Sequence, residues 1–214
     1  MIADNLKKVK SRIDSVEHDQ QVQLIAVSKA RSINEIQQAV DAGQMQFGEN
    51  HLQESLDKID SLEGKNLIWH FIGPIQSNKT ASIAEKFDWV HSIERYKIAK
   101  RLSDQRPPKL SQLNVLLQVN IDREKTKSGF FLEDIEEIIP EIKKLPNISL
   151  RGFMCIPNPD NSAESFTKMA ELISKYPDLN VLSMGMSADL ELAIEKGATF
   201  VRVGTDIFGE REYN

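Results

Sequence analysis

The stretch "LIAVSKARSINE", residues 24–35, predicts the local unit from which this chain is built. Its first four residues are apolar without a polar break, as expected of a short strand that is buried on both faces. Ser32 and Glu35 then stand at the S-x-x-E spacing of a capping box, which marks the first turn of a helix. The stretch therefore predicts a buried strand followed by a helix, with Lys29 at the point where the strand ends.

The same order of strand and helix recurs along the chain. Between the expected strands, apolar residues such as Ile33, Ile36 and Val40 recur at helical spacing, which predicts amphipathic helices. Alternating strands and helices predict an α/β protein with a parallel sheet, and eight strands are the number that closes a (β/α)₈ TIM barrel. Short apolar or β-branched runs predict these strands at residues 22–27, 44–47, 67–72, 89–92, 115–119, 150–156, 181–184 and 200–203.

A doubly wound open sheet is the alternative to a barrel, because periodicity alone does not separate the two. The chain has no G-x-G-x-x-G after its first expected strand, as a Rossmann half would carry. It also has no change in composition that would mark a second domain. We therefore expect residues 1–214 to form a single barrel domain. An extra N-terminal helix, with Leu6, Val9 and Ile13 on its apolar face, is expected before the first strand.

Composition argues against several classes of protein. The 214 residues carry a net charge of -5, which gives no support to nucleic-acid binding. No apolar run is long enough to span a bilayer, and the N-terminus lacks the apolar core of a signal peptide. The single cysteine, Cys155, leaves no intramolecular disulfide, and no cysteine/histidine spacing is typical of a metal site. We expect a cytoplasmic protein that binds neither nucleic acid nor membrane.

In a barrel of this kind, a phosphate site commonly forms after strands seven and eight, at the carboxyl ends of the strands. The seventh expected strand runs into "SMGMSADLE", which contains Ser187, and the eighth runs into "VRVGTDIFG", which contains Gly204 and Thr205. Glycine, hydroxyl groups and helix N-terminal amides suit a phosphate dianion. The plainer alternative is that Ser187 only caps a helix and that the glycine only turns the chain.

Arg202 lies inside the last expected strand, between Val201 and Val203. Side chains alternate along a strand, so its guanidinium is expected on the face opposite these neighbours, which in a barrel is the interior near the mouth. There it either pairs with a carboxylate in the core or contacts a ligand beside the phosphate.

Lys29 ends the first expected strand, which lies beside the eighth when the barrel closes. It is therefore expected near Arg202 and the phosphate site. A partly desolvated lysine is a nucleophile toward carbonyls, so the matching ligand is a carbonyl compound that bears a phosphate. Pyridoxal phosphate has both groups. Two alternatives stay open: a lysine that extends along the surface into solvent, and a phosphoaldehyde enzyme that uses Lys29 without a cofactor.

Other polar residues follow strands of the expected barrel. Asn50 and His70 are candidates for the pocket lining, although Asn50 could instead cap a helix. Lys125 and Lys127 either form a secondary anion site through which a cofactor passes or belong to a solvated loop. Lys79 and Lys127 are the lysines that could hold an aldehyde in place of Lys29.

Motifs along nearly the whole chain resemble those of the YggS/PROSC family of pyridoxal phosphate homeostasis proteins. They are "LIAVSK", "FGENHLQE", "WHFIGPIQSNK", "DWVHSI", "LNVLLQVNI", "KSG", "LRGFMCIP", "SMGMSADLELAI" and "VRVGTDIFGER", in this order. The resemblance implies a monomeric barrel similar to the N-terminal domain of alanine racemase, with pyridoxal 5'-phosphate (PLP) held as a lysine aldimine on Lys29. It also implies a phosphate bound around Ser187, Gly204 and Thr205, and Arg202 facing the pyridine nitrogen.

The implied function is to hold and release PLP in vitamin B6 homeostasis, without catalytic residues, with PLP-dependent apoenzymes as further partners. Arg202 does not accept a proton from the pyridine nitrogen, so the ring is expected to be a weak electron sink. The alternative is a PLP-dependent amino-acid racemase, which needs a second proton-transfer group opposite the lysine. In the racemases that group is a tyrosine from a second domain. This chain ends at Asn214, and Tyr96, Tyr176 and Tyr213 offer no obvious replacement.

Overall fold

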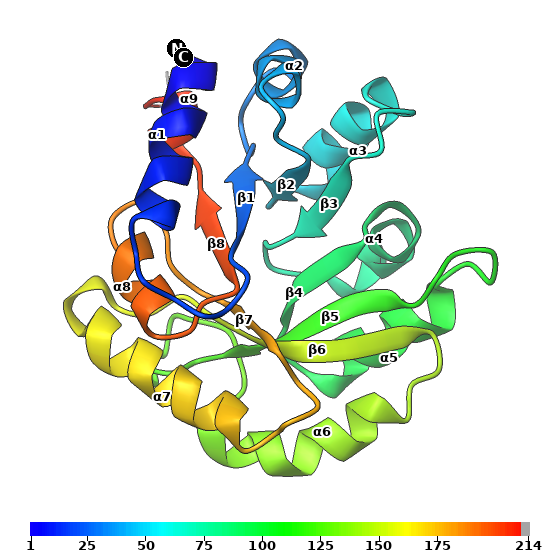
Figure 1. The fold of residues 1–214 in the computed structure, drawn as a ribbon. Helices are drawn as coiled ribbons and strands as arrows, with labels where there is room; N and C mark the ends of the chain where they lie inside the picture. Colours follow the sequence, from blue (N-terminus) through cyan, green and yellow to red (C-terminus); the bar gives the residue numbers. More distant parts are fainter. Residues whose placement is uncertain (211–214) are drawn as a thin grey trace.

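The structure, a computed structural model, describes residues 1–210 and shows a closed barrel of parallel strands with helices around it (Figure 1). Each strand pairs with the next one in the chain, and β8 pairs with β1 to close the barrel. The expected (β/α)₈ architecture is confirmed. The strands are β1 (Gln23–Val27), β2 (Gln46–Glu49), β3 (Ile68–Phe71), β4 (Trp89–Ile93), β5 (Leu113–Val119), β6 (Ile148–Cys155), β7 (Val181–Ser183) and β8 (Phe200–Val203).

The helices cover the outside of the barrel, and none of those in residues 1–210 is long and apolar enough to cross a bilayer. The first helix precedes the barrel and lies beside the last one (Figure 1), with Leu6, Val9 and Ile13 buried. This is the extra N-terminal helix that the sequence predicts. The helices are α1 (Ile2–Asp14), α2 (Ile33–Asp41), α3 (Leu52–Ser61), α4 (Thr80–Lys86), α5 (Tyr96–Gln105), α6 (Ile135–Lys143), α7 (Ser162–Ser174), α8 (Leu190–Glu195) and α9 (Thr205–Phe208).

The capping box in the first strand–helix unit forms as the sequence predicts. The backbone N–H of Glu35 donates to Ser32 Oγ at 3.2 Å, and the backbone N–H of Ser32 donates to Glu35 Oε2 at 2.8 Å. Two amides that the helix itself cannot satisfy are thereby paired. The chain consequently leaves β1 through a short segment around Lys29 and enters α2 directly.

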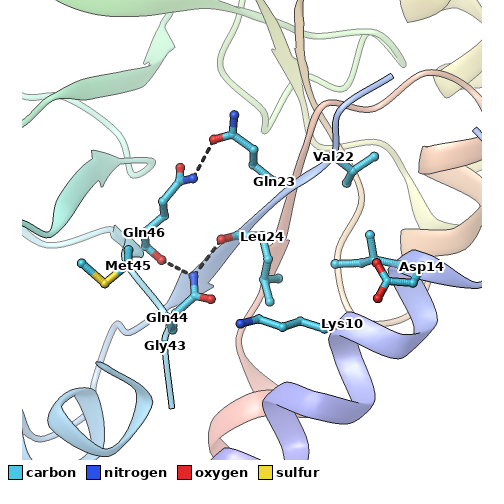
Figure 2. Close-up of a pocket in the computed structure, with 10 residues that line it drawn as sticks. Lys10, Asp14, Val22, Gln23, Leu24, Gly43, Gln44, Met45 and Gln46 are labelled. Carbon is cyan, nitrogen blue, oxygen red and sulfur yellow. Dashed lines mark hydrogen bonds between the residues drawn. The ribbon is translucent and has the colours of Figure 1, made fainter. Parts of the chain in front are cut away.

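The second strand begins two residues later than expected, at Gln46 rather than Gln44. The side-chain amide of Gln44 donates to the carbonyl oxygens of Leu24 at 2.8 Å and Gln46 at 2.7 Å (Figure 2). These bonds hold residue 44 in the turn before the strand. The shift makes Glu49 the last residue of β2 and sets Asn50 directly beyond its carboxyl end.

Strand β6 has a β-bulge in its pairing with β5, just before the residues that also pair with β7. Val115 pairs with Leu150 whereas Leu116 pairs with Gly152, so Arg151 is the extra residue. Gly152 has a φ of 154°, and a Cβ built on it would lie 2.0 Å from the carbonyl oxygen of Val181. The backbone of β7 thus approaches β6 at a place that only glycine allows.

We expect Gly152→Ala to lower the free energy of unfolding by about 3 kcal/mol, because strand backbone must move to admit the methyl group. Gly64→Ala is the matched control. Gly64 also has a positive φ, 82°, but nothing lies within 4 Å of its added Cβ, so only a conformational cost of about 1 kcal/mol is expected. Urea unfolding of both variants measures the difference. Equal losses would mean that the contact with Val181 is unimportant.

Candidate functional site

A cavity of about 300 Å³ opens at the carboxyl ends of the barrel strands. Its volume is within the range of small-molecule sites, and its lining combines apolar residues with a few polar groups. It brings together most of the residues that the sequence singled out, from segments far apart in the chain. The lining consists of Val27, Lys29, Arg31, Asn50, Ile72, Ile156, Met186, Ser187, Ala188, Arg202, Gly204 and Thr205.

His70 does not belong to this lining, and the structure corrects that expectation. Its ring is fully buried in the barrel interior, where Nδ1 lies 2.9 Å from His91 Nε2 and Nε2 lies 3.0 Å from Gln46 Oε1. Side chains alternate along β3, so residue 70 points inward one layer below the mouth. Ile72, two residues further along the same face, reaches the cavity instead.

The backbone on both sides of Lys29 is held by side chains of α3. On one side, Lys58 Nζ donates to the carbonyl oxygen of Ser28 at 2.7 Å. On the other, the backbone N–H of Ala30 donates to Glu54 Oε1 at 2.6 Å, and Ala30 has a φ of 58°. A non-glycine residue in the left-handed region is strained, so neighbouring bonds must maintain it. The lysine is therefore presented from a rigid turn.

Lys58, Glu49 and Glu54 form a partly buried charged group, which we call the Lys58 clamp. Lys58 is 3% exposed, and its Nζ donates to Glu49 Oε1 at 2.8 Å and also to Glu54. Ser28 Oγ donates to the same Glu49 oxygen at 2.6 Å, while Glu49 Oε2 is buried without a hydrogen-bond partner among the described residues. Burial raises the pKa of Glu49, although the Lys58 charge opposes that shift. No pattern in the sequence indicates the clamp, because Glu49 and Lys58 lie in different elements.

Ser187, Gly204 and Thr205 lie at one end of the cavity, after β7 and β8. Ser187 does not cap α8: the helix begins at Leu190 with Asp189 as its N-cap residue. Gly204 is close to β1, since a Cβ on it would lie 3.3 Å from the carbonyl oxygen of Val27. The backbone of the β8 turn therefore reaches the cavity beside the strand that carries Lys29.

Arg12 of α1 ties these two turns together from outside the cavity. Its guanidinium donates to the Ser187 carbonyl oxygen at 2.9 Å, to Glu191 at 2.6 Å and to Asp206 at 2.6 Å. Paired donors in a planar fork suit such a bridge between two chain segments. Arg12 is a further residue that the sequence did not single out, since its partners lie at the far end of the chain.

Arg202 points into the barrel at the floor of the cavity, as alternation along the last strand predicts. It is 5% exposed, and it donates to Ser183 Oγ at 2.7 Å and to the carbonyl oxygen of Cys155 at 3.0 Å. Its hydrogen-bond partners are thus a hydroxyl and a carbonyl, rather than the carboxylate of the alternative interpretation. Burial lowers the pKa of Arg202, but an arginine remains charged at neutral pH.

The cavity has the positive charge expected of an anion-binding site, and it also contains one hydrogen-bond acceptor, Asn50 Oδ1, that a ligand could satisfy. Lys29, Arg31 and Arg202 bring three cationic side chains to the lining. Asn50 Oδ1 is buried and has no hydrogen-bond partner among residues 1–210. A buried acceptor without a donor is costly, so a ligand hydroxyl or N–H at this position would be stabilising. Within the same residues, no group of three His, Cys, Asp or Glu side chains could hold a metal ion.

The other lysines of interest lie at or beyond the rim. Lys127 Nζ donates to Glu124 at 2.6 Å and to the carbonyl oxygen of Ile156, a lining residue, at 3.2 Å. Lys125 is exposed on the same loop, and Lys79 lines a neighbouring hollow. Lys127 therefore contacts the backbone of a lining residue.

Two of the three tyrosines, Tyr96 and Tyr176, lie in the part of the chain that the structure describes, and neither belongs to this lining. Tyr96 is exposed at the start of α5. Tyr176 follows α7 and packs on Phe153, with ring centroids 5.9 Å apart. Tyr213 lies outside the described residues.

The barrel and its cavity define the class of protein. The family model for the N-terminal domain of alanine racemase matches residues 1–212, and the chain belongs to this family. The chain is 49% identical to the pyridoxal phosphate homeostasis protein of Pseudomonas aeruginosa PAO1, over 99% of this chain and 96% of that one. It is 44% identical to that of Escherichia coli K12, over 100% of this chain and 98% of that one. Within the family, the chain therefore belongs with the pyridoxal phosphate homeostasis proteins.

A solved structure gives the same likeness in three dimensions. PipY of Synechococcus elongatus PCC7942, solved with PLP bound, matches with a TM-score of 0.85 at 34% sequence identity. The match covers 98% of this chain and 100% of that chain.

Proposed function

We propose that this protein binds PLP in the cavity at the mouth of the barrel and serves in intracellular PLP homeostasis by holding and releasing it. The observation that carries the proposal is the meeting of Lys29, Arg202 and the two turns after β7 and β8 around one cavity. The homeostasis proteins to which the chain is similar, and PipY with PLP bound, support the same ligand.

The described residues fit the groups of this ligand. PLP supplies an aldehyde that condenses reversibly with amines. Lys29 is the amine for that aldehyde. The phosphate is met by hydroxyl groups and by backbone amides of Ser187, Gly204 and Thr205. Amides in the first turn of a helix have no acceptor within the helix, so they are available to the phosphate oxygens. Arg202 donates to the pyridine nitrogen. Asn50 Oδ1, which has no hydrogen-bond partner among the described residues, accepts from a ligand hydroxyl or N–H.

The residues that line the cavity suit a PLP carrier better than they suit the alternative, a PLP-dependent racemase. A racemase that uses Lys29 as one base needs a second acid or base on the other face of the cofactor. Among the described lining residues, Lys29 is accompanied by arginines, amides and hydroxyls, but by no histidine, carboxylate, thiol or phenol. Arg202, as a permanent donor, also keeps the pyridine nitrogen unprotonated. Both features favour holding and releasing PLP over proton transfer.

Residues 1–214 act as a single PLP-binding barrel domain and as a monomer in the cytoplasm. An incoming amine on a PLP-dependent apoenzyme displaces Lys29 and takes the cofactor away. Lys127, beside the rim residue Ile156, is placed where an anionic cofactor would leave.

The test is the visible spectrum of the purified wild-type protein titrated with PLP. A yellow band that borohydride removes is expected, and the reduced adduct should map to the peptide that contains Lys29. Racemisation of alanine and other amino acids, followed by circular dichroism, should stay at the level of free PLP. No band would reject the cofactor and favour the phosphoaldehyde alternative. Turnover well above that of free PLP would reject the carrier.

A further inference from the structure

A row of hydrogen-bonded polar side chains crosses the barrel interior, starting from Arg202 at the floor of the cavity. Arg202 Nη1 donates to Ser183 Oγ at 2.7 Å. Ser183 Oγ lies 2.8 Å from Nδ1 of His91. Both Ser183 and His91 are fully buried, so these contacts are made without solvent.

The row continues to the opposite end of the barrel. His91 Nε2 lies 2.9 Å from His70 Nδ1, and His70 Nε2 lies 3.0 Å from Gln46 Oε1. The amide of Gln46 then donates to Gln23 Oε1 at 2.6 Å. Figure 2 shows this last bond beside a hollow at the amino ends of β1 and β2. Six side chains from β8, β7, β4, β3, β2 and β1 thus form one chain of hydrogen bonds.

The Gln46 end of the chain decides the direction of the bonds. The amide nitrogen of Gln46 donates to Gln23, so its Oε1 faces His70 and can only accept, and His70 therefore carries a proton on Nε2. A neutral His70 accepts at Nδ1, so His91 donates from Nε2 and is left to accept at Nδ1 from Ser183 Oγ. Ser183 Oγ in turn accepts from Arg202, which only donates. Each of the three groups between the ends thus accepts from the cavity side and donates toward the far side.

The surroundings of the two histidines keep both rings neutral. His70 stacks on Trp89 and meets Phe200 edge-on, and His91 contacts the same two aromatic rings. Among residues 1–210, the charged side chain bonded into the chain is Arg202, whose positive charge opposes a second one. Burial lowers the pKa of His70 to about 3, and burial together with Arg202 lowers the pKa of His91 well below 6.5.

We infer that Ser183, His91 and His70 are positioning residues, which hold the Arg202 guanidinium toward the ring nitrogen of the ligand through this one-directional chain. The inference rests on the proposed function, since PLP is the ligand whose nitrogen Arg202 addresses. The chain does not conduct protons, because the amides of Gln46 and Gln23 at its far end do not release them. Its role is to leave Arg202 a single orientation.

The first experiment uses the protein without ligand, and so it tests the chain even if PLP does not bind. In ¹⁵N NMR spectra of the histidine rings, both His70 and His91 should show the neutral tautomer protonated on Nε2. Their resonances should stay unchanged between about pH 5 and pH 8. His70→Gln and His91→Gln spectra provide the assignments. A proton on Nδ1 of either ring, or titration within this range, would overturn the inference.

The second experiment reads out Arg202 through PLP labelled with ¹⁵N in the pyridine ring. Ser183→Ala should shift the ring-nitrogen resonance and weaken PLP binding about tenfold, because Arg202 loses a buried hydrogen-bond acceptor. Ser92→Ala is the matched control: Ser92 is also buried in the barrel wall, but its hydroxyl donates to Gly73 instead. It should leave the resonance unchanged.

His91→Phe gives a second break in the chain, with an aromatic ring of similar size to preserve packing. It should shift the ring-nitrogen resonance in the same direction as Ser183→Ala, and His91→Gln, which keeps a donor and an acceptor, should restore part of it. An unshifted resonance in a folded Ser183→Ala or His91→Phe protein would overturn the positioning role. Failure of the wild-type protein to bind labelled PLP would instead reject the proposed function and leave the tautomer result standing.

Discussion

Lys29→Ala is expected to abolish the yellow band that the wild-type protein develops with PLP, together with the adduct that borohydride traps. The amine of Lys29 is the group at the end of β1 that can condense with the aldehyde, and alanine removes it. The proposed contacts to the phosphate and to the pyridine nitrogen do not involve Lys29, so PLP should still bind without a covalent bond and more weakly. Absorbance spectra before and after borohydride, with mass spectrometry of the intact protein, measure both effects.

Lys127→Ala and Lys79→Ala are the controls for this prediction. Lys127 lies at the rim and Lys79 in the neighbouring hollow, so each tests whether a second lysine can take the aldehyde. Both variants should keep the band and the trapped mass. A full band in Lys29→Ala that disappears only when Lys127 is also replaced would move the covalent site to the rim. It would also contradict the role assigned to Lys29.

The sequence predicted the fold and half of the cavity lining because both depend on local patterns. Short apolar runs marked the strands, and the Ser32–Glu35 spacing marked the first helix after a strand. Period-two alternation was enough to turn Arg202 inward. Closing the barrel then brought residues that end or follow β1, β7 and β8 together, as its topology requires.

The sequence failed where a side chain's role depends on its layer or on distant partners. His70 in β3 and Ile72, which directly follows the strand, point to the same inward face. Alternation does not say which of the two side chains reaches the cavity at the mouth of the barrel. Lys58 stands four residues after Glu54, a spacing typical of an exposed ion pair on a helix. Its burial follows from Glu49 and from the Ser28 carbonyl oxygen, neither of which a helical pattern reveals.

Lys58→Met is expected to lower the free energy of unfolding by about 3–5 kcal/mol near pH 8. Methionine fills a similar volume, but it leaves Glu49 as a buried charge and the Ser28 carbonyl oxygen without its donor. Lys86→Met is the matched control, because Lys86 pairs with Asp60 at the surface and should cost at most about 1 kcal/mol. Urea unfolding of both variants at constant ionic strength measures the difference.

The pH dependence of unfolding should identify the Glu49 charge as the source of that loss. Burial already raises the pKa of Glu49 above 4.5 in the folded protein, and removing the Lys58 charge raises it further. A carboxyl group whose pKa is raised on folding contributes stability below its unfolded pKa and loses it as pH rises through the folded value. The loss in free energy of unfolding caused by Lys58→Met should therefore be smaller at pH 5 than at pH 8.

Adding Glu49→Gln to Lys58→Met separates the buried charge from the lost packing. The amide cannot ionise, so the double variant should recover part of the stability at pH 8, and its deficit should no longer grow with pH. A deficit that is the same at pH 5 and pH 8 in the single variant would assign the loss to packing alone. The same variants also test the turn around Lys29: with its Ser28 anchor gone, Lys58→Met should trap less PLP with borohydride than Lys86→Met does.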